Sequence, residues 1–258
     1  MKLLVLSVVL VLLSSIGSKL DKVVSLKDQD QFDVDPLGNL YLYNNDSLIK
    51  QSSDGKILYR YSNLLRSNLS SIDASNSLKI LTLDIPNQMV RHFDNTLAPM
   101  GNEINLTDLG LFQVTKCIQT PNYIIAYDSN LHELIYINKS GLIEFRSGNL
   151  SQIANIPKGI EQLSFQLNKI IVGTPKLTAI FDVNGIFERK IHHLTPIQWF
   201  QLKGKNDYLV AIGKEILLVD LTSENQIIEL PSEIGKFKII GSKLYCKSLN
   251  KLYIYSIP

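Results

Sequence analysis

Six charged residues stand in or beside short extended segments that we expect to lie at the centre of a repeated sheet structure, namely Asp33, Asp35, Asp73, Lys116, Glu161 and Lys238. Carboxylates that converge could bind calcium or act as a general acid and base in hydrolysis. However, the six charges have mixed signs, and no single polar residue type recurs at the equivalent position of every repeat. A ring of metal ligands would need such recurrence. The sequence therefore assigns no catalytic, metal-binding or cofactor-binding residue.

Histidine and serine residues form no recognised catalytic pattern. His192 and His193 are adjacent in sequence, and neighbouring residues of a strand point to opposite faces, so the two rings cannot easily share a metal ion. We expect this pair in an edge strand or a turn. Gly-x-Ser-x-Gly and the glycine-rich loops that bind phosphates or dinucleotides are absent from the sequence. These observations predict a protein that is not an enzyme and needs no cofactor.

A unit of short extended segments separated by turns recurs six times, with a period of about 40 residues. In the first unit, three of these segments are Leu40–Tyr43, Ser47–Ser52 and Ile57–Tyr61. Four short strands per unit at this period are typical of a blade of a β-propeller. The sequence therefore predicts an all-β fold, a six-bladed β-propeller of four-stranded blades.

Turn residues mark the step from the third to the fourth strand of each blade. Gly55, Gly141 and Gly185 end three such turns, each after an Asp or Asn residue that can bond to the local backbone. In the second blade, the segment Asp94–Asn102 contains Pro99 and Gly101. We expect this segment to be a longer link than the corresponding turns of the other blades.

The last repeat provides three strands only, over Lys236–Ile240, Leu244–Lys247 and Leu252–Ile257. A spare extended segment, Lys22–Leu26, stands near the other end of the chain. Pairing this segment with the last blade would close the ring and cover a strand edge that would otherwise promote aggregation. The sequence therefore predicts closure by an N-terminal strand.

The first eighteen residues have the order of features found in a secretory signal. Lys2 supplies a positive charge, residues 3–13 are almost entirely apolar, and residues 14–18 are mostly small. The apolar run is shorter than the roughly 20 residues of a membrane span, and no Cys near the cleavage point could carry a lipid anchor. We expect a signal peptide over residues 1–18, one domain over residues 19–258, and a periplasmic or secreted protein without direct membrane insertion.

The charge of the chain is nearly balanced, with 26 basic and 24 acidic residues and a net charge of +2. Basic residues are scattered rather than clustered, which argues against a nucleic-acid partner. Cys117 and Cys246 fall in different repeats of the ring, and a disulfide needs Cα atoms within about 7 Å. We therefore expect two buried free thiols.

The pattern resembles the six-bladed propellers of the NHL and TolB-like group. The resemblance rests on the segment Asp35–Tyr41 and on the glycine-containing turns, and it extends over almost all of the chain after the signal. Trp-Asp pairs of the WD40 class and the double glycines of kelch repeats are absent. Frequent Asn, Lys, Ile and Leu residues are typical of a low-GC bacterium, and together with the export signal they suggest a member of the Bacteroidota.

Three functions are compatible with these features. The first, which we favour, is an exported protein-interaction module or accessory subunit of a bacterial envelope assembly, for example a periplasmic plug-like subunit of the type IX secretion translocon. Its partner would be an outer-membrane or envelope protein, and the expected contact residues are Pro99, Met100, Trp199 and Phe200. The alternatives are a hydrolase or lyase that acts on a sugar or lactone with a channel metal, and a propeller that binds a small ligand or glycan.

Overall fold

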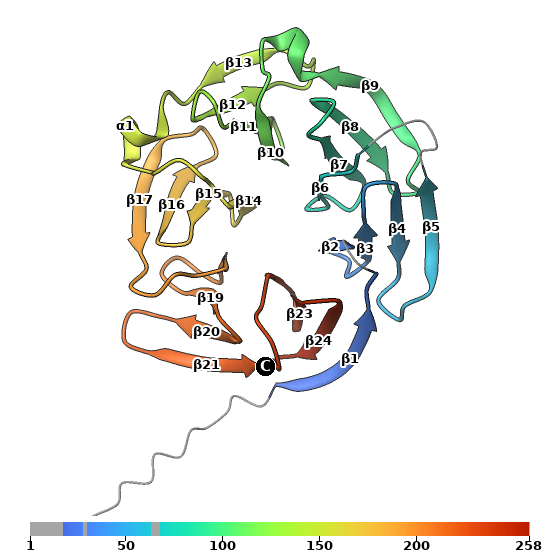
Figure 1. Ribbon diagram of the computed structural model, residues 1–258, viewed down its shortest axis with the longest axis vertical. Coiled ribbons are helices and arrows are strands. Elements are labelled where there is room, and N and C mark those ends of the chain that lie inside the picture. Colours follow the sequence, from blue (N-terminus) through green and yellow to red (C-terminus); the bar gives the residue numbers. More distant parts are fainter. Residues whose placement is uncertain (1–17, 28–29, 63–67, 258) are drawn as a thin grey trace, which may run out of the picture.

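The computed structural model describes residues 18–27, 30–62 and 68–257, which form a ring of six four-stranded antiparallel sheets (Figure 1). This ring confirms the predicted all-β, six-bladed propeller. The predicted signal peptide, residues 1–18, lies outside the described residues except for Ser18.

Each blade is one sheet in which the strands follow one another from the centre of the ring to its rim. Blade 1 consists of β2 (Gln31–Val34), β3 (Leu40–Tyr43), β4 (Ser47–Gln51) and β5 (Ile57–Ser62). Blade 2 consists of β6 (Ser71–Asp73), β7 (Lys79–Asp84), β8 (Met89–Asp94) and β9 (Pro99–Asn105). Blade 3 consists of β10 (Val114–Gln119), β11 (Ile124–Asp128), β12 (Glu133–Ile137) and β13 (Ile143–Arg146). Blade 4 consists of β14 (Gln162–Gln166), β15 (Lys169–Thr174), β16 (Leu177–Asp182) and β17 (Phe187–His192). Blade 5 consists of β18 (Trp199–Leu202), β19 (Tyr208–Ile212), β20 (Glu215–Val219) and β21 (Glu224–Glu229). Blade 6 consists of β22 (Lys236–Ile240), β23 (Lys243–Ser248), β24 (Lys251–Ser256) and β1 (Lys19–Ser25). Two short helices, η1 (Leu106–Leu109) and α1 (Leu150–Ala154), lie in connections between blades.

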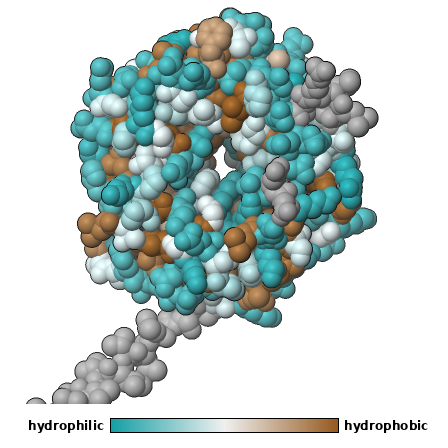
Figure 2. Space-filling view, in the orientation of Figure 1, coloured by the Kyte–Doolittle hydropathy of each residue, from teal (hydrophilic) through white to brown (hydrophobic). Residues whose placement is uncertain are grey.

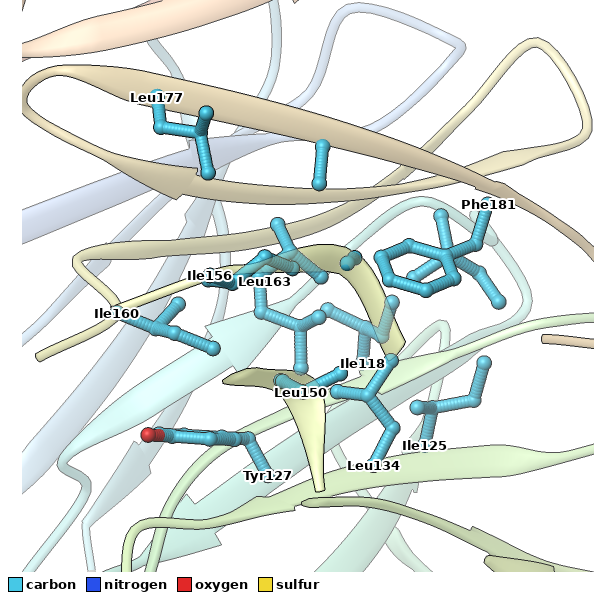
Figure 3. Close-up of a cluster of buried hydrophobic side chains, with 14 of the residues drawn as sticks. Ile118, Ile125, Tyr127, Leu134, Leu150, Ile156, Ile160, Leu163, Leu177 and Phe181 are labelled. Atoms are coloured by element: carbon cyan, nitrogen blue, oxygen red, sulfur yellow. The ribbon is translucent and has the colours of Figure 1, made fainter. Parts of the chain in front are cut away.

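The middle strands of the blades are buried on both faces because each sheet packs between two neighbouring sheets. Every residue of β3 and β11 is buried, whereas β5 on the rim is mostly exposed. Between blades 3 and 4, Ile118, Leu163 and Phe181 belong to one apolar cluster, which Leu150 of α1 joins from the connection (Figure 3). Burial of such side chains between sheets is the main source of stability of the ring.

Tight turns join the third and fourth strands of the blades, as the sequence predicted. The carboxylate of Asp182 accepts hydrogen bonds from the backbone N–H groups of Asn184 and Ile186 at 2.9 and 2.8 Å. Gly185 has a φ of 83°, a value that favours glycine. The side chain of Asn138 closes the equivalent turn of blade 3 in the same way.

The prediction of a long link over Asp94–Asn102 is wrong. Strand β8 ends at Asp94 and β9 begins at Pro99, so only Asn95–Ala98 lie between them. The carboxylate of Asp94 closes this tight turn by accepting hydrogen bonds from the N–H groups of Thr96 and Ala98 at 2.8 and 2.9 Å. Pro99 and Gly101 lie in the outermost strand of the blade. Proline has no N–H group to donate, and an outermost strand tolerates this because no further strand needs that hydrogen bond.

The predicted closure is confirmed, because β1 pairs with β24 along the rim of the last blade (Figure 1). The register runs from Lys19 opposite Ser256 to Ser25 opposite Lys251, so the strand begins three residues earlier than the predicted segment. Asp21 adds hydrogen bonds at 2.6 Å from both the Lys243 ammonium group and the Ser256 hydroxyl. Residues near the two ends of the chain therefore share one sheet.

The strand order gives the ring two different faces. Since neighbouring strands in each blade are antiparallel, the turns from first to second strand and from third to fourth strand lie at the same end of every blade. We call this end the turn face. The opposite end, the connector face, carries the turns from second to third strand and the connections between blades.

Candidate functional site

A central channel of about 930 Å³ runs between the innermost strands of the six blades, and its opening is visible in the middle of the disc (Figure 2). Five of the six predicted channel residues line it, namely Asp33, Asp73, Lys116, Glu161 and Lys238. The structure therefore brings the predicted charged residues to the place where chemistry would occur. Their hydrogen bonds show how they are used.

Asp33 of β2 joins the first blade to both of its neighbours. Its carboxylate accepts a hydrogen bond from the Lys238 ammonium group of blade 6 at 2.7 Å and another from the N–H of Ala74 in blade 2 at 2.9 Å. Burial raises the pKa of Asp33, but the charges of Lys238 and Lys236 and the hydrogen bonds outweigh burial and leave the pKa below its usual value. Asp33 is thus an ionised, paired carboxylate that holds three blades together.

Asp73 has the equivalent role between blades 2 and 3. Its Oδ2 accepts a hydrogen bond from the N–H of Gln119 at 2.8 Å, and the Gln119 side chain donates back to the Asp73 carbonyl at 3.0 Å. Burial is the main cause of a raised pKa for Asp73, and the negative charge of Asp33 raises it further. A carboxyl group with a raised pKa could serve as a general acid, but here its oxygen is already bonded to the next blade.

Glutamine side chains make the same kind of bridge elsewhere in the ring, and the sequence reasoning missed them. Gln162 accepts from the N–H of Phe200 at 3.0 Å and donates to the Phe200 carbonyl at 2.7 Å. Gln201 does the same with the backbone of Ile239, at 2.9 and 3.1 Å. With Asp33, Asp73 and Lys238, these bonds bridge five of the six junctions between innermost strands. A glutamine in an innermost strand could have indicated such a bridge from the sequence, because its amide group both donates and accepts hydrogen bonds.

The junction between β10 and β14 differs from the other five. The described residues form no side-chain hydrogen bond between these two strands. Lys116 and Glu161 face the channel there, and burial lowers the pKa of Lys116 although the negative charge of Glu161 acts in the opposite direction. The apolar cluster of Figure 3 holds this junction.

The prediction of Asp35 as a channel residue is wrong. Asp35 is fully buried in the turn between β2 and β3, where its carboxylate accepts hydrogen bonds from the N–H groups of Leu37 and Asn39 at 2.9 Å. The Tyr41 hydroxyl donates to the same carboxylate at 3.1 Å. Aspartate commonly closes turns in this way, so the residue shapes the turn and does not line the channel.

The prediction of Phe200 as a contact residue is wrong, because its side chain is fully buried. Its ring stacks on that of Tyr208, with 5.0 Å between the ring centres. Trp199 lines the channel, where the Lys236 ammonium group lies 5.3 Å from the centre of its ring. Pro99 and Met100 are exposed at the turn-face end of β9. The role of Pro99 and Met100 as partner contacts stays a prediction.

His132 and His193 form structural hydrogen bonds, and both thiols are buried. His192 lies exposed in the outermost strand β17, as predicted, and His193 bonds to the Thr178 hydroxyl at 2.9 Å. His132 is fully buried, with its ring nitrogens bonded to the Tyr127 hydroxyl and the Ile156 carbonyl at 2.8 and 2.9 Å. Cys117 and Cys246 are free and buried, which confirms that prediction. Burial raises the pKa of both thiols.

In residues 18–27, 30–62 and 68–257, no three His, Cys, Asp or Glu side chains gather as a metal site would require. In the same ranges, no helix is long and apolar enough to cross a membrane.

The turn face carries exposed aliphatic side chains in the turns of blades 1 to 5. They are Leu37, Leu78, Leu142, Leu167, Ile186 and Leu221. The connector face also has exposed apolar residues, among them Phe112, Leu194 and Leu249.

Comparison with known proteins yields the fold and no family. No family model matches the chain, and no curated protein matches it. Among solved structures, it is similar to the WD40 domain of Neurospora crassa Pan2, with 13% identity, a TM-score of 0.60, and coverage of 88% of this chain and 74% of that one. The β-propeller domain of Myceliophteria thermophila Cps50 (Swd1) gives 10% identity, a TM-score of 0.62 and coverage of 94% and 100%.

A third similar structure is a catalytically inactive variant of virginiamycin B lyase from Staphylococcus aureus with quinupristin. It gives 12% identity, a TM-score of 0.63, and coverage of 88% of this chain and 80% of that one. At such low identities these similarities show a β-propeller fold alone.

The role of Asp33 can be tested through the pH dependence of stability. Because the folded-state pKa of Asp33 is depressed, its contribution is complete above the usual pKa of aspartate and is lost as the pH falls through the folded-state value. We expect Asp33→Asn to lower the free energy of unfolding by about 3 kcal/mol at neutral pH, since it leaves Lys238 without its buried partner. The difference from the wild type should shrink as the pH falls below the usual pKa of aspartate and through the lower folded-state value.

Urea unfolding over this pH range measures the effect, with the exposed turn residue Asp46 changed to Asn as the matched control. An equal loss of stability at all pH values would show that the Asp33 charge is not what holds the blades.

Proposed function

We propose that this protein is a non-enzymatic scaffold for protein interaction, and that a partner docks on the turn face. The observation that supports this proposal is the set of exposed aliphatic side chains in the turns of blades 1 to 5. They lie on one face of five of the six blades, at loop positions where propellers and other scaffolds present binding residues.

The fold itself does not require apolar residues at these positions. Leu142 and Ile186 each follow the glycine of a turn between third and fourth strands, and Lys56 occupies the same position after Gly55 in blade 1. Leu142 is 60% exposed and Ile186 is 65% exposed. A lysine satisfies the same turn and would be better hydrated, so the apolar residues point to a function outside the fold.

The bonds within the channel support a role without catalysis. Asp33 and Asp73 are the carboxylates that a hydrolytic or metal-dependent mechanism would use first, and both are bonded to neighbouring blades. Of the three predicted carboxylates that line the channel, Glu161 alone has no such bond within the described residues. A lone carboxylate does not supply the pair of acid and base groups that glycoside hydrolysis uses.

The cellular setting is part of the same proposal and rests on the sequence. The predicted signal peptide over residues 1–18 and the amino-acid usage support an exported, periplasmic or secreted protein of a Bacteroidota-like bacterium, related to the NHL and TolB-like propellers. In this setting the partner is an outer-membrane or envelope protein, and the protein acts as an accessory subunit of an envelope assembly such as the type IX secretion translocon.

A paired comparison of the two faces tests the docking proposal. The tagged full chain is purified with its partners from native envelopes, as wild type, as the turn-face variant Leu142→Ser/Ile186→Ser, and as the connector-face variant Phe112→Ser/Leu249→Ser. All four residues are large, apolar and exposed, so both variants should fold normally. We expect the turn-face variant to lose about tenfold or more of the co-purified partner, and the connector-face variant to keep it.

Equal recovery from both variants would overturn docking on the turn face. Isolation of the wild type alone, with bound calcium, would favour the hydrolase or lyase alternative, and isolation with a bound sugar would favour the glycan-binding alternative.

A further inference from the structure

A groove of about 890 Å³ lies between blades 2 and 3, opening on the turn face and extending along β9 to η1 at the connector face. Its walls are the turn around Asn76, the turn around Asn122, the turn over residues 138–141, and strand β9 with η1. The groove is separate from the central channel, since the two share no lining residue among the described ones. If the protein is the scaffold proposed above, this groove identifies the chemistry of its partner.

Two lysines from different blades face this groove without partners. Lys79 begins β7, and Lys139 lies in the turn before β13. Neither ammonium group forms an ion pair within the described residues. Burial lowers the pKa of Lys79, and the nearby positive charge of Lys139 lowers it further. An anion between the two lysines would relieve this repulsion.

The acidic residues of the groove are already engaged with other groups. Glu103 accepts a hydrogen bond from the Arg91 guanidinium group at 2.7 Å, and Asp108 accepts one from the Asn105 side chain at 3.1 Å. The Asn105 amide is neutral, so Asp108 keeps its negative charge at the η1 end of the groove, whereas Glu103 is paired with Arg91. Lys79 and Lys139 lie at the turn-face end without an ion-pair partner among the described residues, and that end of the groove favours a negatively charged occupant.

His92 of β8 adds an unused hydrogen-bonding atom to the same groove. Its Nε2 atom is buried and has no partner within the described residues. Burial is the main cause that lowers the pKa of His92 to about 4, with the charge of Lys79 as a second cause, so the ring is neutral at neutral pH. A buried polar atom without a partner is costly, and a bound segment that reaches it would remove this cost.

The backbone of β9 bends at this groove. Val90 pairs with Ile104 and His92 pairs with Met100, so Arg91 alone faces the three residues 101–103. Gly101 in this bulge has a φ of 65°. Bulges often occur beside functional sites because they redirect side chains, and this one sets the wall of the groove away from the regular ladder.

Exposed apolar side chains border the lysines. Leu78 precedes Lys79, Leu142 follows the turn that contains Lys139, and Met100 lines the groove from β9. Leu78 and Leu142 are also members of the exposed set that supports docking on the turn face. A small inorganic anion would leave these apolar residues in water, whereas a peptide can cover both kinds of group.

We propose that the groove between blades 2 and 3 binds an extended acidic segment of a partner protein. A carboxylate of this segment lies between Lys79 and Lys139, and its neighbouring apolar side chains pack on Leu78, Leu142 and Met100. Asn76, Asn102 and Asn122 line the same groove and supply amide groups for the peptide backbone.

A synthetic peptide of alternating Asp and Leu, labelled with a fluorophore, tests the proposal directly. Fluorescence polarisation compares it with the matched peptide of alternating Asn and Leu. We expect the acidic peptide to bind the wild type about tenfold more tightly than the neutral one, with affinity that falls as salt is added. We expect Lys79→Gln/Lys139→Gln to remove this preference.

Lys56→Gln is the matched control, because Lys56 lies exposed on the same face in the turn of blade 1 that is equivalent to the turn of Lys139. It should bind both peptides as the wild type does. An absence of binding to the wild type, equal affinity for both peptides, or an equal loss in the Lys56 variant would overturn the proposal.

The two proposals fail separately. The Leu142→Ser/Ile186→Ser variant and the Lys79→Gln/Lys139→Gln variant are both purified from native envelopes. If the first loses the partner and the second keeps it, docking on the turn face stands and the acidic-segment inference is wrong. If no partner is recovered and the acidic peptide still binds through the two lysines, the groove stands and the envelope role fails.

Discussion

Removal of residues 19–25 is expected to leave the ring largely unfolded at 37 °C. Strand β1 pairs with β24 over its whole length and supplies the fourth strand of the last blade. Six paired positions in this register, at about 1 kcal/mol for each hydrogen bond, approach the total stability of a typical domain, which is about 5 to 15 kcal/mol. The deletion also uncovers the edge of β24 and removes Val24, which packs on the cluster around Phe32.

Differential scanning calorimetry of chains that begin at residue 18 and at residue 26 measures this effect. Addition of a synthetic peptide with residues 18–25 to the shortened chain is the control, and it should restore most of the lost melting temperature by occupying the empty edge. A shortened chain that melts at the wild-type temperature would show that β1 does not hold the ring closed.

The second large effect is expected at the junction of blades 3 and 4. Phe181 is fully buried in the apolar cluster between these blades (Figure 3), and the described residues form no side-chain hydrogen bond between β10 and β14 that could compensate. Phe181→Ala should therefore lower the free energy of unfolding by about 3 to 5 kcal/mol. Equilibrium unfolding in urea measures the change.

Phe112→Ala is the matched control for this junction, because Phe112 is 68% exposed on the connector face. Its effect should stay within about 0.5 kcal/mol. A cost for Phe181→Ala as small as that of the control would mean that packing at this junction contributes little to the ring.

The sequence could predict the blades because each repeat carries its own local signals. Strand segments such as Leu40–Tyr43 and turn glycines such as Gly185 act within a few residues, so their effect is readable without the rest of the fold. The closing strand was also predictable, since an incomplete last repeat and a spare first strand satisfy each other.

Features that depend on the neighbouring blade were not predictable in the same way. Phe200 looked like a contact residue beside Trp199, but the phase of β18 turns its side chain into the core, and a shift of one residue exchanges the faces of a strand. Asp33 and Asp35 look alike in sequence, yet one bonds across two junctions and the other closes its own turn. The groove at Lys79 and Lys139 requires two blades to be placed side by side.

The shared sheet of β1 and β24 has a consequence for how the protein is made. A ribosome adds about 5 to 20 residues per second, so Ser25 waits on the order of 10 s or more before Lys251, its pairing residue, is synthesised. During this interval the earliest strand has no native neighbour, and the β24 edge of a second chain that is already complete offers the same hydrogen bonds. Holding that strand apart until translation ends is therefore a natural task for a chaperone, and crowded synthesis should favour exchanged dimers.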